Sequence, residues 1–238
     1  MIVVPLAVPT VPFGQVQGRI ARLCDPFERN PHIAVFGTTG SGKSHLMRYG
    51  ILPLRAYSRT VVIDVKDDRD SVWSGFGKKV TELPRAFSGT GENSHAARWR
   101  LVVDRRNAQA QLRRVFDQIR DEGHCVVVID ESRSITEREQ AGLGSVVENL
   151  ILEGRGLGVT MLIGAQSTKW AVPSLKDQPA ALFIGQCVGQ DQAIDQAKVA
   201  GYGRELAVVI QQIEAREWLY RDLWEGPPIL GLCSAPVA

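Results

Sequence analysis

The segment Gly37-Thr38-Thr39-Gly40-Ser41-Gly42-Lys43-Ser44 reads G-x-x-x-x-G-K-S and directly follows the apolar run His32–Phe36. Leu46, Met47 and Tyr49 come next, so the order of elements is strand, glycine-rich loop and helix. Glycines let consecutive backbone N–H groups turn toward phosphate oxygens, and a helix N-terminus favours negative charge. The segment therefore predicts a loop that binds the phosphates of a nucleotide.

All eight residues of this loop are candidate nucleotide-binding residues. The Lys43 ammonium is expected to reach the β- and γ-phosphates, and the Ser44 hydroxyl to complete the coordination of Mg²⁺. The alternative is a glycine-rich turn with a surface lysine. A second motif at a suitable distance downstream argues against that alternative.

That second motif is the apolar run Cys125–Ile129 followed by Asp130 and Glu131. An unbroken apolar run of this length is typical of a parallel strand buried on both faces. We expect Asp130 to hold Mg²⁺ together with Ser44, and Glu131 to polarise the water that attacks the γ-phosphate of ATP. Alternatively, Asp130 caps a helix and Glu131 is only solvated. The two motifs together predict a P-loop NTPase, and Glu131 favours hydrolysis over transfer of the phosphoryl group to another substrate.

Strand and helix patterns alternate from residue 32 onward, which predicts an α/β fold with a mostly parallel sheet flanked by helices. The expected strands are His32–Gly37, Thr60–Val65, Trp99–Val103, His124–Asp130, Gly158–Ile163 and Ala181–Gly185. The expected helices are Lys43–Leu52, Ala108–Glu122, Leu143–Glu153 and Asp191–Ala200. Glu205–Ile213 can be helical, and Trp218–Leu223 can be a helix or an edge strand. Four prolines make residues 1–30 an irregular N-terminal arm, which we expect to lie on a neighbouring subunit, and residues 31–238 a single motor domain.

The composition is that of an ordinary globular protein, with 238 residues, 44% hydrophobic residues and 23% charged residues. The net charge of +2 does not indicate a nucleic-acid partner, but ten basic residues between Lys78 and Arg120 stand against four acidic ones. Such a stretch either follows phosphates or forms a solvated face with intersubunit pairs. The four cysteines fit no metal-ligand pattern, and the apolar N-terminus lacks a basic leader, so we expect a cytoplasmic protein without an integral membrane segment.

Three further segments resemble the FtsK/HerA superfamily of ring-forming ATPases. Asp64-Val65-Lys66 is similar to the Asp-x-Lys element of FtsK-type DNA translocases, and the stretch from Leu150 to Ser167 resembles their helix, Arg/Gly turn, strand and Ala-Thr-Gln. The tail from Val172 to Gly185 also resembles the segment after that glutamine in the same proteins. One departure is Gly164-Ala165-Gln166-Ser167, which stands where the translocases have Ala-Thr-Gln. As a single motor domain, the chain most resembles the genome-packaging ATPases of tectivirus-like viruses.

This resemblance implies a homo-oligomeric ring, a hexamer or a pentamer, that moves double-stranded DNA without reading its sequence, in the host cytoplasm or with the virion. It also implies a docking partner such as a capsid, a portal or a membrane protein. Gln166 would bond the γ-phosphate or the attacking water, unless its amide only caps a strand end. Arg155 would reach the γ-phosphate of a neighbouring subunit, although a cation before a glycine is also a good helix cap, and Arg133 competes for the role. The pore loop is expected within Lys66–Arg98.

Two alternatives to a packaging motor remain open at this stage. One is a conjugation, plasmid-transfer or HerA-like DNA-processing motor. The other is an assembly or secretion ATPase that binds no DNA, which the small net charge favours.

Overall fold

The computed structural model describes residues 4–23, 31–55, 59–67, 71–84, 97–104, 106–137, 141–223 and 230–235. In these residues the chain forms one nine-stranded sheet in the order β3-β4-β2-β5-β6-β1-β7-β8-β9. Neighbouring strands pair in parallel from β3 through β7, and the pairs β7–β8 and β8–β9 are antiparallel. The strands are β1 (Ile33–Phe36), β2 (Arg59–Asp64), β3 (Lys78–Val80), β4 (Arg98–Val102), β5 (Cys125–Ile129), β6 (Val159–Ala165), β7 (Ala181–Ile184), β8 (Glu217–Asp222) and β9 (Leu230–Ser234).

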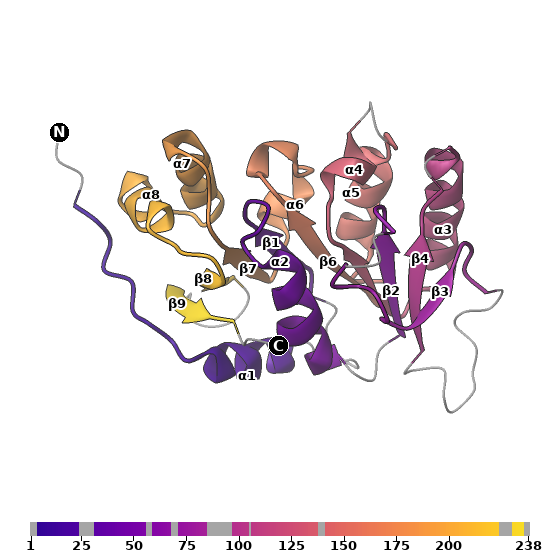
Figure 1. The fold of residues 1–238 in the computed structure, drawn as a ribbon, viewed down its shortest axis with the longest axis horizontal. Helices are drawn as coiled ribbons and strands as arrows, with labels where there is room; N and C mark the ends of the chain where they lie inside the picture. Colours follow the sequence, from indigo (N-terminus) through magenta and orange to yellow (C-terminus); the bar gives the residue numbers. More distant parts are fainter. Residues whose placement is uncertain are drawn as a thin grey trace.

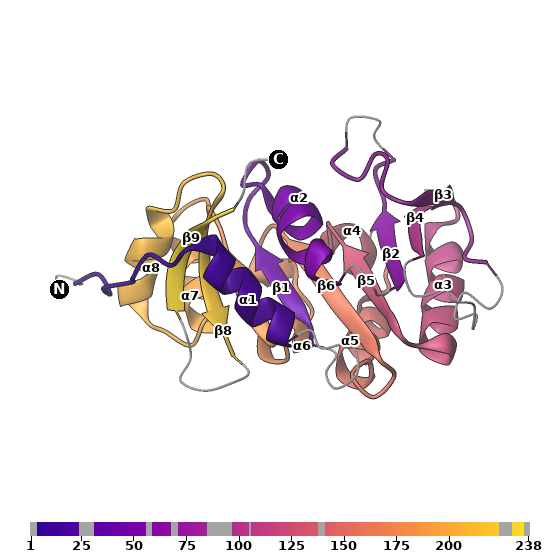
Figure 2. The same cartoon turned by 90° about the horizontal axis from the view of Figure 1, so that it is seen from below.

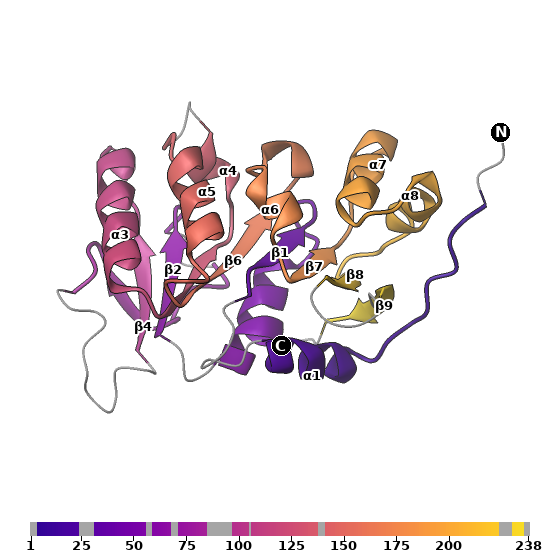
Figure 3. The ribbon, with the colours of Figure 1, turned by 180° about the vertical axis from the view of Figure 1, so that it is seen from behind.

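Helices cover both faces of this sheet (Figure 1). One face carries α3 (Ala108–Glu122), α5 (Gly144–Glu153), α6 (Ser174–Asp177), α7 (Gln190–Val199) and α8 (Arg204–Gln211), as Figure 3 shows from behind. The other face carries α1 (Phe13–Leu23), α2 (Lys43–His45) and the π-helical turn η1 (Leu46–Ile51) that continues α2 (Figure 2). The short elements η2 (Leu52–Arg55), α4 (Arg133–Thr136) and η4 (Thr168–Trp170) complete the described structure.

The central strands bury side chains on both faces, so two hydrophobic cores lie back to back. On β5, Val127 packs into the core under α3 and α5, whereas Val126 and Val128 pack into the core under α1 and η1. Alternate residues of a strand point to opposite faces, which is why an unbroken apolar run is needed here.

The predicted α/β class is confirmed, and the six predicted strands and three of the predicted helices agree with the structure to within two residues at either end. The fourth predicted helix, Lys43–Leu52, is α-helical over Lys43–His45 and continues as a π-helix over Leu46–Ile51. The helix expected over 205–213 is α8, and Trp218–Leu223 is the strand β8. Because β9 pairs with β8 on its far side, β8 is not an edge strand. The short strands β3 and β9 were not predicted.

The irregular lead-in expected through residue 30 is wrong for Phe13–Leu23, which forms the helix α1. Pro12 precedes this helix, where a missing backbone N–H costs nothing. Val16 and Ile20 are one turn apart and fully buried against the sheet. The Arg19 guanidinium bonds the Asp222 carboxylate of β8 at 2.9 Å and fixes the helix to the sheet.

The described part of the N-terminal arm bonds to its own chain, and the contact with a neighbouring subunit stays a prediction. The Leu6 N–H donates to the Glu205 carbonyl at 3.2 Å, and the Val11 N–H donates to the Leu232 carbonyl at 2.7 Å. Within the described ranges, no helix has both the length and the apolar character that crossing a membrane requires.

Candidate nucleotide-binding site

The glycine-rich loop joins the carboxyl end of β1 to the start of α2, as predicted. Gly40 and Gly42 have φ values of +84° and +95°, a region that residues with a Cβ rarely adopt. The Gly37 N–H donates to the Ala165 carbonyl at the end of β6, and the Ser41 carbonyl accepts from the Arg216 N–H at 3.0 Å. The loop is therefore held between β6 and the start of β8.

The Lys43 ammonium lies under this loop. Its Nζ atom donates to the carbonyl oxygens of Gly37 at 2.7 Å and Thr38 at 2.9 Å. Burial lowers the pKa of Lys43, and the nearby carboxylates of Glu131 and Asp130 oppose that shift. The lysine thus stands at the centre of the loop, within reach of the two acidic residues that end β5.

The Asp130 carboxylate accepts hydrogen bonds from two elements. The Ser44 hydroxyl lies 2.9 Å from Oδ1 and 2.7 Å from Oδ2. The indole Nε1 of Trp73 donates to Oδ2 at 3.0 Å. The structure therefore brings the two predicted metal ligands together, and it adds Trp73, which sequence reasoning missed because a lone aromatic residue in an irregular segment carries no pattern.

Glu131 and Gln166 form the second pair of the site. Gln166 Nε2 donates to Glu131 Oε2 at 2.5 Å, and the Gln166 carbonyl accepts from the Gln192 amide on α7 at 2.7 Å. The other carboxylate oxygen, Glu131 Oε1, is buried and has no hydrogen-bond partner in the described part of the chain. A buried carboxylate oxygen without a partner is costly unless a ligand or water bonds it, so this oxygen marks a place for one.

Gly164 explains the departure from the Ala-Thr-Gln pattern. A Cβ at this position would lie 2.5 Å from the Asp130 carbonyl oxygen, and the Gly164 carbonyl accepts from the Ser132 N–H at 2.9 Å. The glycine lets the ends of β5 and β6 come close, and so brings Glu131 beside Gln166.

An open pocket of about 710 Å³ lies beside the loop. Its wall includes Thr38, Thr39 and Gln166, and the Thr38 N–H donates to the Gln186 carbonyl after β7 at 2.9 Å. The remaining lining residues are Ser167, Lys169, Trp170, Gln186, Cys187, Val188, Asp191 and Gln192. The pocket leaves room for a ligand next to the predicted phosphate loop.

Arg155 and Arg133 lie at opposite edges of the sheet. The amino edge is the one where the parallel strands begin, and the carboxyl edge is the one where they end. Arg155 is in the turn before β6, at the amino edge, and its Nη2 donates to the Gln178 carbonyl at 2.5 Å. Arg133 follows β5 at the carboxyl edge; it bonds Glu137 at 2.8 Å, lies 4.1 Å from the Trp170 ring centre and is 46% exposed. Of these two arginines, Arg133 is the one on the same edge as the loop of its own chain.

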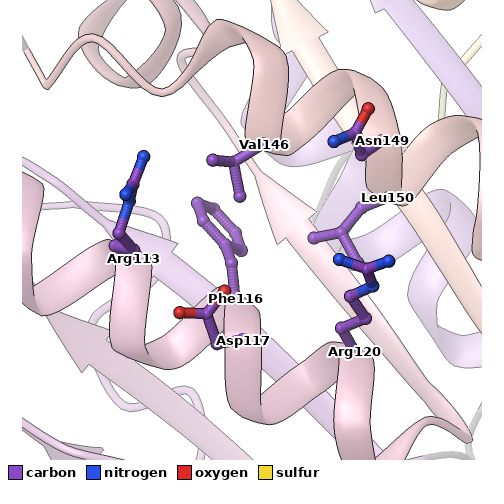
Figure 4. A pocket seen from close by; sticks show the side chains of 7 residues that line it. All are labelled: Arg113, Phe116, Asp117, Arg120, Val146, Asn149 and Leu150. Carbon is purple, nitrogen blue, oxygen red and sulfur yellow. The ribbon is translucent and has the colours of Figure 1, made fainter.

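Several residues of the basic stretch are paired with acids of the same chain. These on-chain pairs are Lys79–Asp67, Arg100–Asp64, Arg114–Glu82 and Arg120–Glu153. Arg113 and Arg120 also line a hollow of about 190 Å³ between α3 and α5 (Figure 4). The pairing favours the solvated-face interpretation over phosphate tracking for these residues. The predicted pore loop falls partly on residues 68–70 and 85–96, which lie outside the described residues.

No family model matches the chain, and no curated protein matches it. Solved structures do match. The genome-packaging NTPase B204 of Sulfolobus turreted icosahedral virus 2, in complex with ATP-γ-S, aligns with a TM-score of 0.67 and 16% identity over 90% of this chain and 100% of that one. The bacterial conjugative coupling protein TrwB aligns with a TM-score of 0.61 and 12% identity over 97% and 93%.

A type VII secretion ATPase, EccC of Thermomonospora curvata, is similar over one part of its length. Its cytoplasmic domain aligns with a TM-score of 0.52 and 17% identity over 87% of this chain and 26% of that one. At these identities the likeness establishes the fold. The P-loop NTPase fold predicted from the sequence is confirmed, and it is the fold of packaging and coupling ATPases, in agreement with the FtsK/HerA resemblance.

Proposed function

We propose that this chain is an ATPase that moves double-stranded DNA, and that it packages a viral genome. The observation that carries the proposal is the cluster at the carboxyl edge of the sheet. There the phosphate loop, the Ser44–Asp130 pair and the Glu131–Gln166 pair lie together. The fold likeness to a genome-packaging NTPase over the whole of its chain supports the same role.

The loop from Gly37 to Ser44 would bind the phosphates of ATP. Its backbone N–H groups and the N-terminus of α2 favour negative charge. Lys43 would exchange its bonds to the Gly37 and Thr38 carbonyls for bonds to the β- and γ-phosphates, which fits its central position under the loop.

Ser44 and Asp130 fit a magnesium ion. The hydroxyl and carboxylate oxygens lie 2.7 to 2.9 Å apart, and such oxygen ligands are the ones that Mg²⁺ prefers. The ion would neutralise charge on the phosphates. The two side chains hold each other in place and need little rearrangement to share a ligand.

Glu131 would act as the general base. Its unpartnered Oε1 is available to take a proton from the attacking water, while Gln166 holds Oε2. A positioned base contributes about 10²- to 10⁴-fold to a rate. Gln166 bonds the base directly, so a γ-phosphate that attracts the Gln166 amide would alter the position of Glu131. Gln166 would therefore act as a sensor of the phosphate.

In a ring of five or six copies, ATP at each interface would receive an arginine from the next subunit. Arg155 is the first candidate, and Arg133 is the competing one because it is exposed at the carboxyl edge. An arginine finger is worth about 10³- to 10⁵-fold in rate. We expect Arg155→Ala to lose turnover at an unchanged fraction of folded protein, and a surviving rate would assign the finger to Arg133.

The ATPase rate with and without double-stranded DNA, at low and moderate salt, tests the proposal. We expect DNA to stimulate hydrolysis, and the stimulation to fade with salt because contacts to phosphates release counterions. Lys43→Ala should lower both the basal and the stimulated rate by about 10²- to 10³-fold. Hydrolysis that ignores DNA at every salt concentration would contradict the proposal.

A second candidate is an assembly or secretion ATPase without DNA. The on-chain pairing of the basic residues and the likeness to the secretion ATPase favour it. The likeness to TrwB in turn keeps a conjugation motor open. An ATPase rate that does not depend on DNA would indicate an assembly or secretion ATPase. DNA stimulation that depends on a nuclease would indicate a HerA-like processing motor.

A further inference from the structure

Trp73 is buried in the segment between β2 and β3, and only 1% of it is exposed. Its side chain lies in the core that also contains residues of α1 and η1. The indole Nε1 donates to Asp130 Oδ2 at 3.0 Å. An aromatic side chain from a separate segment therefore makes a directional contact with a predicted metal ligand.

The two oxygens of the Asp130 carboxylate are unequal because of this contact. Oδ2 accepts from both the Trp73 indole and the Ser44 hydroxyl, whereas Oδ1 accepts from Ser44. A serine hydroxyl that coordinates a metal uses an oxygen lone pair for the ion and keeps its one hydrogen for a single carboxylate oxygen. The indole bond to Oδ2 would then remain, and Oδ1 would be left for the ion or its water.

We propose that Trp73 is a positioning residue that orients the Asp130 carboxylate for Mg²⁺, an inference that rests on the proposed ATPase function. Ligating carboxylates are themselves held by hydrogen bonds in metal sites, and those partners set the affinity of the ion. Trp73 does so with a neutral donor that adds no charge to the site.

Trp73 can hold the carboxylate because its own segment is fixed. Its N–H donates to the Ser71 hydroxyl at 3.2 Å, and its ring meets Phe76 edge to face at 5.6 Å. The guanidinium of Arg48, on η1, donates to the Ser74 carbonyl at 2.9 Å. These contacts fix the ring from two sides.

The same segment connects the metal carboxylate to a basic surface. Arg48 and Arg98 both lie over the Phe76 ring, at 5.9 and 5.7 Å from its centre. The segment thus runs from the nucleotide site to Phe76, which lies within Lys66–Arg98, the range predicted to contain the pore loop.

The test is the Mg²⁺ concentration that half-saturates binding of a fluorescent, non-hydrolysable ATP analogue, compared with binding of the analogue in EDTA. Trp73→Phe keeps the aromatic packing and removes the N–H donor. We expect it to raise the half-saturating Mg²⁺ concentration about 10-fold, the lower end of the range for lost outer-shell partners. Affinity for the metal-free analogue should be unchanged.

Trp99→Phe is the matched control. Trp99 is a partly buried residue of β4 that packs against the core on the other face of the sheet. Loss of this indole should leave the Mg²⁺ dependence as in the wild type. Trp73→His, which retains a ring N–H donor, should recover part of the loss and gives a second reading if Trp73→Phe does not fold.

Unchanged Mg²⁺ dependence in Trp73→Phe would overturn the inference, as would an equal loss of metal-free binding, which indicates a merely structural role. Both outcomes differ from failure of the proposed function, in which the wild-type chain binds no ATP analogue at all.

Discussion

At the carboxyl edge of the sheet, Ser44 bonds Asp130 and Gln166 bonds Glu131, so these two contacts join side chain to side chain, although Lys43 and Gln192 there also donate to backbone carbonyls. At the amino edge, His32 accepts from the Met161 N–H at 3.1 Å and Arg155 donates to a carbonyl, so side chains bond to the backbone. Backbone bonds at the amino edge tie strands and turns together.

This difference separates residues that serve the reaction from residues that serve stability. Each edge has a buried polar atom without a hydrogen-bond partner in the described chain, Glu131 Oε1 at the carboxyl edge and His32 Nε2 at the amino edge, and each is a cost to the folded state. We therefore expect substitutions at the carboxyl edge to lower the rate and leave stability nearly unchanged, and substitution of His32 at the amino edge to do the reverse; Arg155 is the exception, because its proposed role is at the site of a neighbouring subunit.

Among substitutions at the carboxyl edge, the largest expected effect is that of Glu131→Gln. It removes the base with little change in shape, so the ATPase rate should fall about 10²- to 10⁴-fold while ATP binding and the melting temperature remain. Steady-state hydrolysis and thermal unfolding measure the two quantities. Glu214→Gln, at an exposed position, is the control and should keep the full rate. A Glu131→Gln rate equal to that of the wild type would remove Glu131 from the reaction.

Lys43→Ala comes next. Loss of the ammonium removes stabilisation of the charge that develops on the phosphates, and we expect a fall of about 10²- to 10³-fold in rate. Measured ATP affinity should fall as well, because the lysine also contacts the ground state. Lys198→Ala, whose side chain is 69% exposed, should retain the wild-type rate and affinity. Full activity without Lys43 would mean that the loop does not bind the reacting phosphates.

At the amino edge, His32 should make stability depend on pH. Burial, together with the Arg155 charge, lowers the pKa of His32 from 6.5 to about 4. The unfolded chain takes up this proton below pH 6.5 and the folded chain does not. The contribution of about 3 kcal/mol is therefore fully present above pH 6.5 and is lost as the pH falls toward 4.

Denaturant unfolding of the wild type and His32→Gln between pH 7 and 4 checks this prediction. The gap between the two stability curves should narrow as the pH falls. For the exposed residue His124, the free energy of unfolding of His124→Gln should follow that of the wild type across the same pH range. A gap that does not depend on pH would show that His32 is not held neutral by the fold.

The smallest expected effect is that of Arg120→Ala. Arg120 and Glu153 form an exposed pair at 3.0 Å, with 54% and 46% of the two side chains accessible. Such pairs contribute about 0–1 kcal/mol, so stability should change by less than that, and DNA stimulation should not change. If instead DNA affinity fell and its salt dependence weakened, Arg120 would be a phosphate contact, and the solvated-face interpretation would be wrong.

The sequence predicted the central part of the fold and the paired motifs because both have strong local signatures. A buried parallel strand such as β5 requires an unbroken apolar run, and a phosphate loop requires glycines such as Gly42 at positive φ. Gln166 needed a resemblance to be noticed, since a single amide after a strand has no distinctive pattern.

Other parts could not be found in this way for physical reasons. The helix α1 lies between Pro12 and Pro26. The spacing of its apolar residues Val16 and Ile20 indicates a helix, but the four prolines of residues 1–30 favoured an irregular segment. Trp73 reaches Asp130 across 57 residues of sequence, so only the folded chain brings the two together. The roles of Arg155 and Arg133 depend on a neighbouring subunit, which one chain cannot specify.

The most direct test of the central claim, that hydrolysis at the carboxyl edge moves DNA, is displacement of the third strand from a DNA triplex. A motor that moves along the duplex strips the third strand from it. We predict displacement that requires ATP and Mg²⁺, fades as salt weakens the phosphate contacts, and is absent with Glu131→Gln. Full ATPase activity on the same DNA without any displacement would contradict the claim and leave an ATPase that does not translocate.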